Sequence, residues 1–216
     1  MKTKIFFSIL LSIFLLSCSK DKPATPDPDI NNLEGYFLFA KNKDQDGSPV
    51  RIYLFEFRKD KKVLIHTVVY PGSSEEVYEV IDDHTLNIPG TGKFTVEINN
   101  GRAANIDGKY YDVALIKAAP HSRLDGKKFR GVFYSSNGTV LHHVFFYSFE
   151  GNRISAGFDG PAVRTGVYTN IGNFAAIATL PDGYKELLIN ATGNLEVNYH
   201  NSNSMYPQYA SLNEIR

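Results

Sequence analysis

The segment KFTVEINNG, residues 93–101, indicates the fold class of this chain. Its apolar residues Phe94, Val96 and Ile98 alternate with polar residues, so we expect them on one face of a β-strand. Asn100-Gly101 then supplies two residues that adopt positive φ at low cost, as a tight hairpin turn requires. The segment therefore predicts an antiparallel hairpin.

The same alternation recurs between turn dipeptides along the rest of the chain. Thirteen Tyr and fifteen Phe residues, with no Trp, also favour sheets over helices. We expect further strands at 51–58, 63–70, 113–116, 131–135, 140–149, 153–158, 174–179, 184–190 and 195–199, with turns at Asn137-Gly138, Glu150-Gly151, Asp182-Gly183 and Gly193-Asn194. This pattern predicts an all-β fold, an antiparallel meander closed as a barrel or folded as a sandwich.

One segment is compatible with a helix. Ser73 and Glu76 have the spacing of a helix capping box ahead of Val77, Val80 and Ile81. A short helix, a single turn and a further strand remain alternatives for this segment.

The chain resembles itself at an offset of 91 residues. The identical residues of this register are Leu33 and Leu124, Gly35 and Gly126, Gly47 and Gly138, Phe55 and Phe146, Gly92 and Gly183, Ile98 and Ile189, and Asn99 and Asn190. We therefore predict two tandem β-repeats at 33–123 and 124–216, forming one joint domain or two. In this register Phe55 and Phe146 occupy equivalent inward positions. The 184 residues from Leu33 onward are enough to bury a core.

The first residues have the layout of a secretory signal. Lys2 and Lys4 precede an apolar run of twelve residues at 5–16. A helix that crosses a bilayer needs roughly 20 apolar residues, so this run is too short to span one comfortably. We expect residues 1–17 to be a signal peptide that is removed.

Leu15-Leu16-Ser17-Cys18 resembles the lipobox of bacterial lipoproteins. The resemblance implies that the Cys18 thiol carries a diacylglyceryl group and that the chain is cut just before it. Cys18 is the only cysteine, so it cannot form an internal disulfide, and lipidation accounts for its presence. The alternative is an ordinary secreted protein with an unmodified cysteine.

Residues 18–32 are polar and rich in proline, which predicts an extended tether between the lipid and the fold. Ser19-Lys20-Asp21 resembles the short tags that route lipoproteins to the outside of the outer membrane in one group of Gram-negative bacteria. We expect an outer-membrane lipoprotein, with a periplasmic orientation as the alternative to surface exposure.

Each repeat opens with a Leu-x-Gly motif, Leu33-Glu34-Gly35 and Leu124-Asp125-Gly126. These openings resemble the start of small bacterial lipocalin-like domains, in which x-Trp usually follows the glycine. Tyr36-Phe37 and Lys127-Lys128 stand at those positions instead. The resemblance implies a closed meander barrel and no particular ligand.

Two short motifs resemble ion-binding loops without completing them. Asn42, Asp44, Asp46 and Gly47 have the spacing of a calcium loop, but Tyr53 stands where its bidentate glutamate belongs. The segment Gly90-Thr91-Gly92-Lys93 lacks the first glycine and the final Ser or Thr of a phosphate loop. We predict no metal site and no cofactor.

Histidines give no sign of a metal or catalytic site. His142 and His143 are neighbours on an expected strand and point to opposite faces, while His66, His84, His121 and His200 show no ligand spacing. No serine lies in a Gly-x-Ser-x-Gly elbow, so no catalytic residue is assigned.

Basic and acidic residues balance at 23 each, which gives no basic field for nucleic acid. We therefore expect a non-catalytic binding or envelope-complex module, held to a membrane by its lipid and recognising a small molecule, a glycan or a protein. The alternative is a hydrolase acting on envelope or environmental polymers. A deep polar cleft would favour the hydrolase, and a shallow aromatic patch or an apolar barrel mouth would favour binding.

Overall fold

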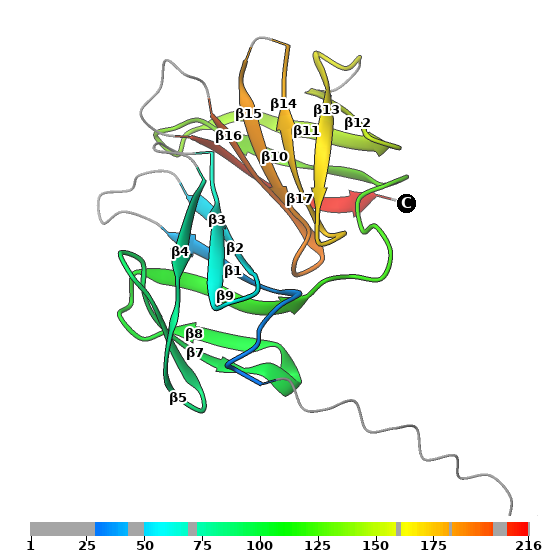
Figure 1. The fold of residues 1–216 in the computed structure, drawn as a ribbon. Coiled ribbons are helices and arrows are strands. Elements are labelled where there is room, and N and C mark those ends of the chain that lie inside the picture. Colours follow the sequence, from blue (N-terminus) through cyan, green and yellow to red (C-terminus); the bar gives the residue numbers. More distant parts are fainter. Residues whose placement is uncertain are drawn as a thin grey trace, which may run out of the picture.

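The computed structural model describes residues 29–42, 50–68, 73–158, 161–181, 183–200 and 207–215. These residues form two antiparallel sheets, which confirms the all-β prediction (Figure 1). The first sheet contains β1 (Tyr36–Asn42), β2 (Arg51–Phe57), β3 (Lys62–His66), β4 (Ser74–Val77), β5 (Glu79–Asp82), β6 (Thr85–Ile88), β7 (Gly92–Glu97), β8 (Arg102–Asn105) and β9 (Tyr110–Lys117). The second contains β10 (Lys128–Tyr134), β11 (Val140–Glu150), β12 (Arg153–Phe158), β13 (Arg164–Ile171), β14 (Ala175–Thr179), β15 (Lys185–Ile189), β16 (Asn194–His200) and β17 (Gln208–Ile215). A 3-10 turn, η2 (Ile98–Asn100), separates β7 from β8.

The second sheet is a closed barrel in which each strand pairs with the next and β10 pairs with β17. The first sheet is a meander of the same kind, with its first strand β1 paired to its last strand β9. It is open between β4 and β5. In the second sheet the single strand β13 takes the positions that β4 and β5 have in the first. Its first half pairs with β12 and its second half pairs with β14, so the sheet closes. The two sheets are thus similar units that differ at one strand.

The segment with capping-box spacing forms β4 and β5, so the helical alternative is wrong. β4 pairs with β3 and β5 pairs with β6. Tyr78 between them is buried in the first core, and Val80 packs against that core. These two residues have the two-residue period of strands, which turns alternate side chains to the same side.

Each sheet encloses its own apolar core. The first core is built around Leu38, Phe55, Phe57, Tyr78, Leu86, Phe94 and Val96, and Ile30 and Leu33 join it from the segment before β1. The second core is built around Leu124, Phe129, Tyr147, Phe149, Ile154, Leu188, Leu195 and Leu212. Large side chains therefore fill the interiors, as in other small barrels.

Phe146 does not face the core, which contradicts its predicted equivalence with Phe55. Phe55 is fully buried in the first core, whereas the inward residues of β11 are Phe145, Tyr147 and Phe149. The match to Phe55 is therefore Tyr147, one residue beyond the position given by the sequence offset. Because side chains alternate along a strand, this single-residue shift places Phe146 on the outer wall.

A third apolar cluster joins the two sheets. Phe37, Phe39, Ile52, Leu54, Val68 and Ile116 of the first unit pack with Ile171, Phe174, Ala175, Leu187 and Ile189 of the second. The Phe37 and Phe174 rings meet edge to face, with centroids 5.1 Å apart. A Cβ added at Gly172 would lie 2.7 Å from the Phe37 ring, so this position needs glycine. The outer walls of β1 and β2 are consequently buried as well as their inner ones.

A polar clamp flanks this apolar contact. Lys41 donates to Glu196 Oε1 at 3.0 Å, and the Glu196 carboxylate also accepts from Tyr209 and Ser211. Asn198, two residues further along β16, accepts from the Ile52 backbone N–H at 2.7 Å. Glu196 and Asn198 are buried, so these bonds compensate polar groups that would otherwise be costly to remove from water.

Candidate functional site

Several predicted positions lie outside the described residues. These are Cys18, the signal peptide, most of the tether and the loop residues Asp44, Asp46 and Gly47. Asn42 is described and is buried at the end of β1. The side chain of Tyr53 stacks on Phe55 in the first sheet, with ring centroids 6.2 Å apart.

The segment at 90–93 forms the turn into β7. The Lys93 backbone N–H donates to Asp107 Oδ2 at 2.7 Å, and a Cβ at Gly92 would lie 2.8 Å from the same oxygen. A carboxylate of the protein therefore occupies the place at which a phosphate would have to approach. This geometry supports the prediction that the segment is a turn.

Apart from the sequence neighbours His142 and His143, the histidines lie on different segments of the chain. His142 is half-buried and His143 is exposed, as expected for neighbours on one strand. His66 is buried beside Glu56 at 2.7 Å, and burial lowers the pKa of its imidazole despite this carboxylate. Among the described residues, no three His, Cys, Asp or Glu side chains are grouped to hold a metal ion.

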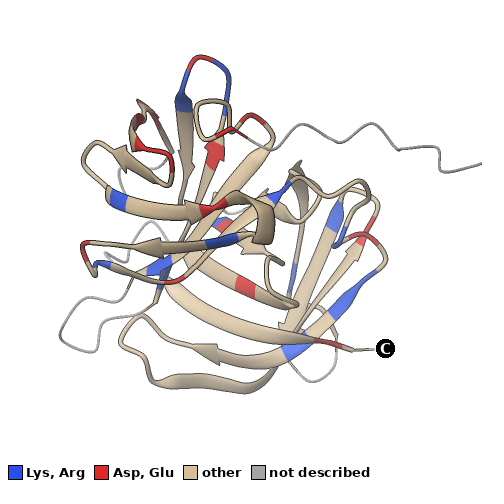
Figure 2. Cartoon of the chain, turned by 90° about the horizontal axis from the view of Figure 1, so that it is seen from below, with Lys and Arg blue, Asp and Glu red and all other residues tan. Residues whose placement is uncertain are grey.

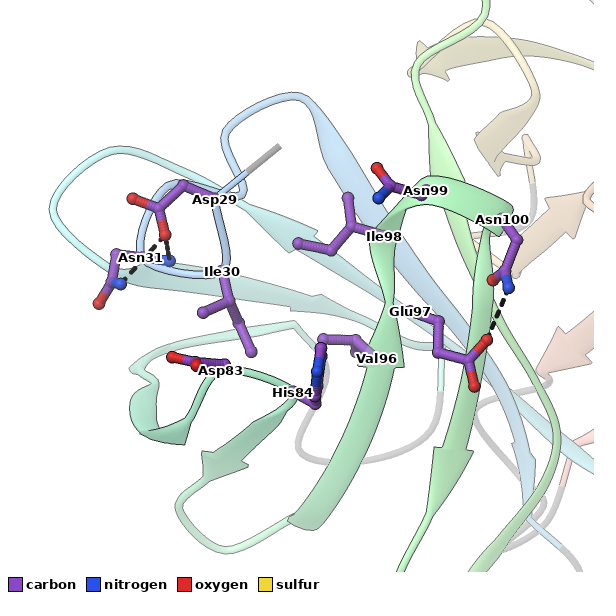
Figure 3. Close-up of a pocket in the computed structure, with 10 residues that line it drawn as sticks. All are labelled: Asp29, Ile30, Asn31, Asp83, His84, Val96, Glu97, Ile98, Asn99 and Asn100. Atoms are coloured by element: carbon purple, nitrogen blue, oxygen red, sulfur yellow. Dashed lines mark hydrogen bonds between the residues drawn. The ribbon is translucent and has the colours of Figure 1, made fainter. Parts of the chain in front are cut away.

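A cavity of about 440 Å³ opens beside the segment that enters the first sheet (Figure 3). It is lined by Asp29, Ile30, Asn31, Asp83, His84, Val96, Glu97, Ile98, Asn99 and Asn100. Ile30 and Val96 contribute apolar surface, and three carboxylates and three amides surround them. No Lys or Arg lines the cavity, so it suits a hydroxyl-bearing or cationic group better than an anion.

Two carboxylates of this cavity are engaged in local bonds. Asp29 accepts from the backbone and side-chain nitrogens of Asn31, and these bonds lower the pKa of its carboxyl. Glu97 accepts from Asn100 Nδ2 at 2.6 Å. These two carboxylates therefore stabilise the turns around the cavity, and only part of their hydrogen-bonding capacity is left for a ligand.

A different site lies at one mouth of the closed barrel. The strands β10, β12, β14 and β16 end there, and β11, β13, β15 and β17 begin there, as the upper rim of the barrel in Figure 1 shows. Arg164, the first residue of β13, turns its guanidinium into this mouth among aromatic rings. The distances from its Cζ to the ring centroids are 4.3 Å for Tyr199, 4.9 Å for Phe145, 5.3 Å for Phe133 and 6.0 Å for Tyr147.

Arg164 forms a buried polar triad with two core side chains. Its Nη2 lies 3.4 Å from Glu186 Oε1 and donates to the Tyr147 hydroxyl at 3.1 Å. Tyr147 in turn donates to Glu186 Oε1 at 3.0 Å. Glu186 and Tyr147 are fully buried, and the Arg164 side chain is 17% exposed. The ion pair therefore sits in the wall of the mouth, next to solvent at the arginine end.

Electrostatics within the triad follow from this burial. Burial, reinforced by the Glu186 carboxylate, holds the pKa of the Tyr147 hydroxyl well above its usual value. Tyr147 therefore remains a neutral donor. The Arg164 Nε is buried and meets no acceptor within the described part of the chain.

A series of rings leads from solvent to Arg164. Phe158 is 45% exposed at the end of β12 and stacks on His142, with centroids 4.6 Å apart at an angle of 18°. His142 contacts Phe145 at 5.7 Å, and Phe145 contacts the guanidinium. Val140, Leu141 and Val163 are also exposed at this end of the barrel. The mouth thus has several exposed apolar residues at its rim and the Arg164–Glu186 ion pair inside.

Sequence reasoning missed this site. Arg164, Glu186 and Tyr147 are on three different strands, and no local spacing connects them. The one available signal was Glu186, which directly precedes the apolar residues Leu187, Leu188 and Ile189 of the strand KELLI. A charge at an inward position implies a buried partner, although it does not name one.

Comparison with known proteins finds no matching family, no matching curated protein and no matching solved structure. Basic and acidic residues are dispersed over both sheets (Figure 2). Within the described ranges, no helix has the length and apolar character needed to cross a membrane.

Proposed function

We propose that the protein is an outer-membrane lipoprotein, anchored through Cys18, whose two β-units form a non-catalytic binding or envelope-complex module. One observation carries the binding role: the exposed Phe158 ring, stacked on His142 at the barrel mouth. Exposed apolar residues that gather at one place mark interaction sites more often than isolated ones do. A ligand with a flat apolar part can extend this stack.

The chemistry of the mouth restricts the ligand further. The Arg164 charge is already balanced by Glu186, so the mouth offers no strong attraction for a second full charge. A ligand whose apolar ring stacks on Phe158, and whose polar atom accepts from Arg164, fits both features. This argument supports a small aromatic or alicyclic ligand over an extended polymer.

Removal of the Phe158 ring is expected to weaken binding at the mouth. The test uses an unacylated form, residues 18–216 with Cys18→Ser, titrated with the uncharged aromatic fluorophore N-phenyl-1-naphthylamine. Phe158→Ala should weaken the affinity by roughly tenfold, because a stacked ring contributes on the order of 1 kcal/mol beyond its buried area. Ile106→Ala, which removes an apolar side chain of 54% exposure from the first unit, is the matched control.

Equal affinities for Phe158→Ala and Ile106→Ala would show that the probe binds elsewhere. Thermal unfolding of each variant should be measured in parallel, because this dye also binds partly unfolded chains. Both side chains are solvent-exposed, so neither substitution is expected to unfold the protein.

The anchor is tested separately in cells. Cys18→Ser is expected to leave the chain uncleaved or soluble, and mass spectrometry of the membrane-extracted wild type should find acyl groups at a mature terminus beginning at Cys18. At least two acyl chains are needed for stable anchoring, since one chain binds only marginally. An unmodified terminus at another residue would contradict the proposal.

A hydrolase is the second candidate, because the cavity beside the first sheet brings His84 together with Asp29, Asp83 and Glu97. Imidazole and carboxylate groups at one cavity can act as acid and base. Polymer cleavage that survives Phe158→Ala and is lost in Glu97→Gln would favour this candidate over binding.

A further inference from the structure

The cavity beside the first sheet is assembled from three turns that lie far apart in the sequence (Figure 3). Residues 29–31 lead into β1, residues 83–84 form the turn between β5 and β6, and residues 96–100 cover the end of β7 and η2. The volume of about 440 Å³ lies within the roughly 300–1,000 Å³ of small-molecule sites. The cavity is therefore large enough for one ring of a small ligand.

Contacts within the fold hold these turns in place. The Val96 backbone N–H donates to the His84 carbonyl oxygen at 2.7 Å, which fixes the β5–β6 turn against β7. Ile30 is buried in the first core, and its carbonyl oxygen accepts from the Tyr78 hydroxyl at 3.4 Å. Because the walls are already ordered, a ligand binds without a large cost for ordering them.

The polar groups that remain available at the cavity both donate and accept. Within the described ranges, the side chains of Asp83, His84 and Asn99 form no hydrogen bond. A carboxylate only accepts, whereas an amide and an imidazole can each donate and accept. Asp29 adds a further acceptor, because Asn31 engages only its Oδ1. A hydroxyl also donates and accepts, so neighbouring hydroxyls of one ligand match this mixed set.

The charges around the cavity do not favour a simple cation. Glu97 accepts from Asn100, and Figure 3 shows these two side chains pointing toward each other. Lys61 brings a positive charge to the rim, since its Nζ donates to Asn31 Oδ1 at 3.3 Å. Among the lining carboxylates in the described part of the chain, only Asp83 has no hydrogen bond. A single exposed carboxylate attracts a cation only weakly in water.

Aliphatic surface lies between the polar groups. In Figure 3 the Ile98 side chain extends toward Ile30 from the opposite wall. Ile98 is half-buried against the first core, so part of its side chain remains open to a ligand. A pyranose ring has an apolar C–H face and hydroxyls at its edge, and it matches this combination. The apolar contact is small, so we expect a dissociation constant on the order of millimolar.

We propose that this cavity binds one pyranose ring of a carbohydrate. Ring hydroxyls donate to Asp83 and exchange hydrogen bonds with His84 and Asn99, while the C–H face covers Ile98. The cavity is the one that the hydrolase candidate uses, so as a substrate assignment this rests on the proposed function. Binding itself requires neither cleavage nor the barrel mouth.

The test is isothermal titration calorimetry of the unacylated form with the methyl glycosides of glucose, galactose and mannose. Protonated cyclohexylamine supplies a six-membered ring with a positive charge and no hydroxyl. We expect at least one glycoside to bind roughly tenfold more tightly than cyclohexylamine. Asp83→Ala and Asn99→Ala should each weaken that glycoside by roughly fivefold, because each removes hydrogen bonds to the ring. Asn213→Ala, which removes an exposed amide of β17, should leave binding unchanged.

Three results would overturn the proposal. Equal or tighter binding of cyclohexylamine would indicate a cation site, and no saturable binding of any glycoside would exclude the pyranose ring. Unchanged affinity in both Asp83→Ala and Asn99→Ala would place the sugar elsewhere. Both positions are exposed, so the thermal unfolding of these variants should match that of the parent.

Failure of this site is distinguishable from failure of the proposed function. Fluorophore binding at the mouth should persist in Asp83→Ala and Asn99→Ala, because neither residue lies in the second unit. Glycoside binding without polymer cleavage would remove the hydrolase candidate alone.

Discussion

Arg164→Gln is expected to lower the free energy of unfolding by about 3–5 kcal/mol, because it leaves the Glu186 carboxylate buried without its cation. Glu186 has no exposed surface and shares its Oε1 with Tyr147 and Arg164. Glutamine can donate a hydrogen bond but carries no charge, so it cannot compensate the desolvated carboxylate. Urea unfolding at neutral pH, followed by circular dichroism, measures the loss.

A double substitution distinguishes the contribution of the ion pair to the free energy of unfolding from the contribution of side-chain packing. Arg164→Met combined with Glu186→Gln removes both charges and retains apolar contact with the surrounding rings. We expect this double variant to be more stable than Arg164→Gln alone, because pairs of buried charges can be replaced together at little cost. If Arg164→Gln lost less than about 1 kcal/mol, the pair would behave as a surface salt bridge.

Phe55→Ala is expected to destabilise the first unit by about 3–5 kcal/mol, the usual cost of truncating a fully buried phenylalanine. Phe55 has no exposed surface and contacts the rings of Tyr53, Phe94 and Tyr110. Its removal leaves a cavity that several strands line, so local collapse cannot fill it easily. This loss is a large fraction of the roughly 5–15 kcal/mol that stabilises a typical domain.

Phe146→Ala is the matched control, and it tests the one-residue shift between β2 and β11. It removes the same side chain from the corresponding strand of the second unit, but from the outer wall, and we expect a loss below about 1.5 kcal/mol. Equal losses at Phe55 and Phe146 would contradict the one-residue shift between the two strands. Differential scanning calorimetry would also show whether Phe55→Ala shifts one transition or separates two, since a third apolar cluster couples the units.

Some strand positions were accessible from the sequence alone. The strand at 153–158 was predicted with the bounds of β12, and the turn at Glu150-Gly151 precedes it with Gly151 at φ 60°. Other strands, among them β13 and β17, were not predicted. β1 was missed because its outer side packs on the second unit, so its residues YFLFAKN do not alternate.

What the sequence by itself determined is the all-β class, many of the turns and the similarity of two units. Local alternation and turn chemistry act over a few residues, so these features need no knowledge of distant contacts. Only the tertiary structure decided which face of β11 is inward, because a shift of one residue preserves the pattern and inverts every side chain. It also decided the triad of Arg164, Glu186 and Tyr147, since barrel closure brings together strands that no spacing along the chain relates.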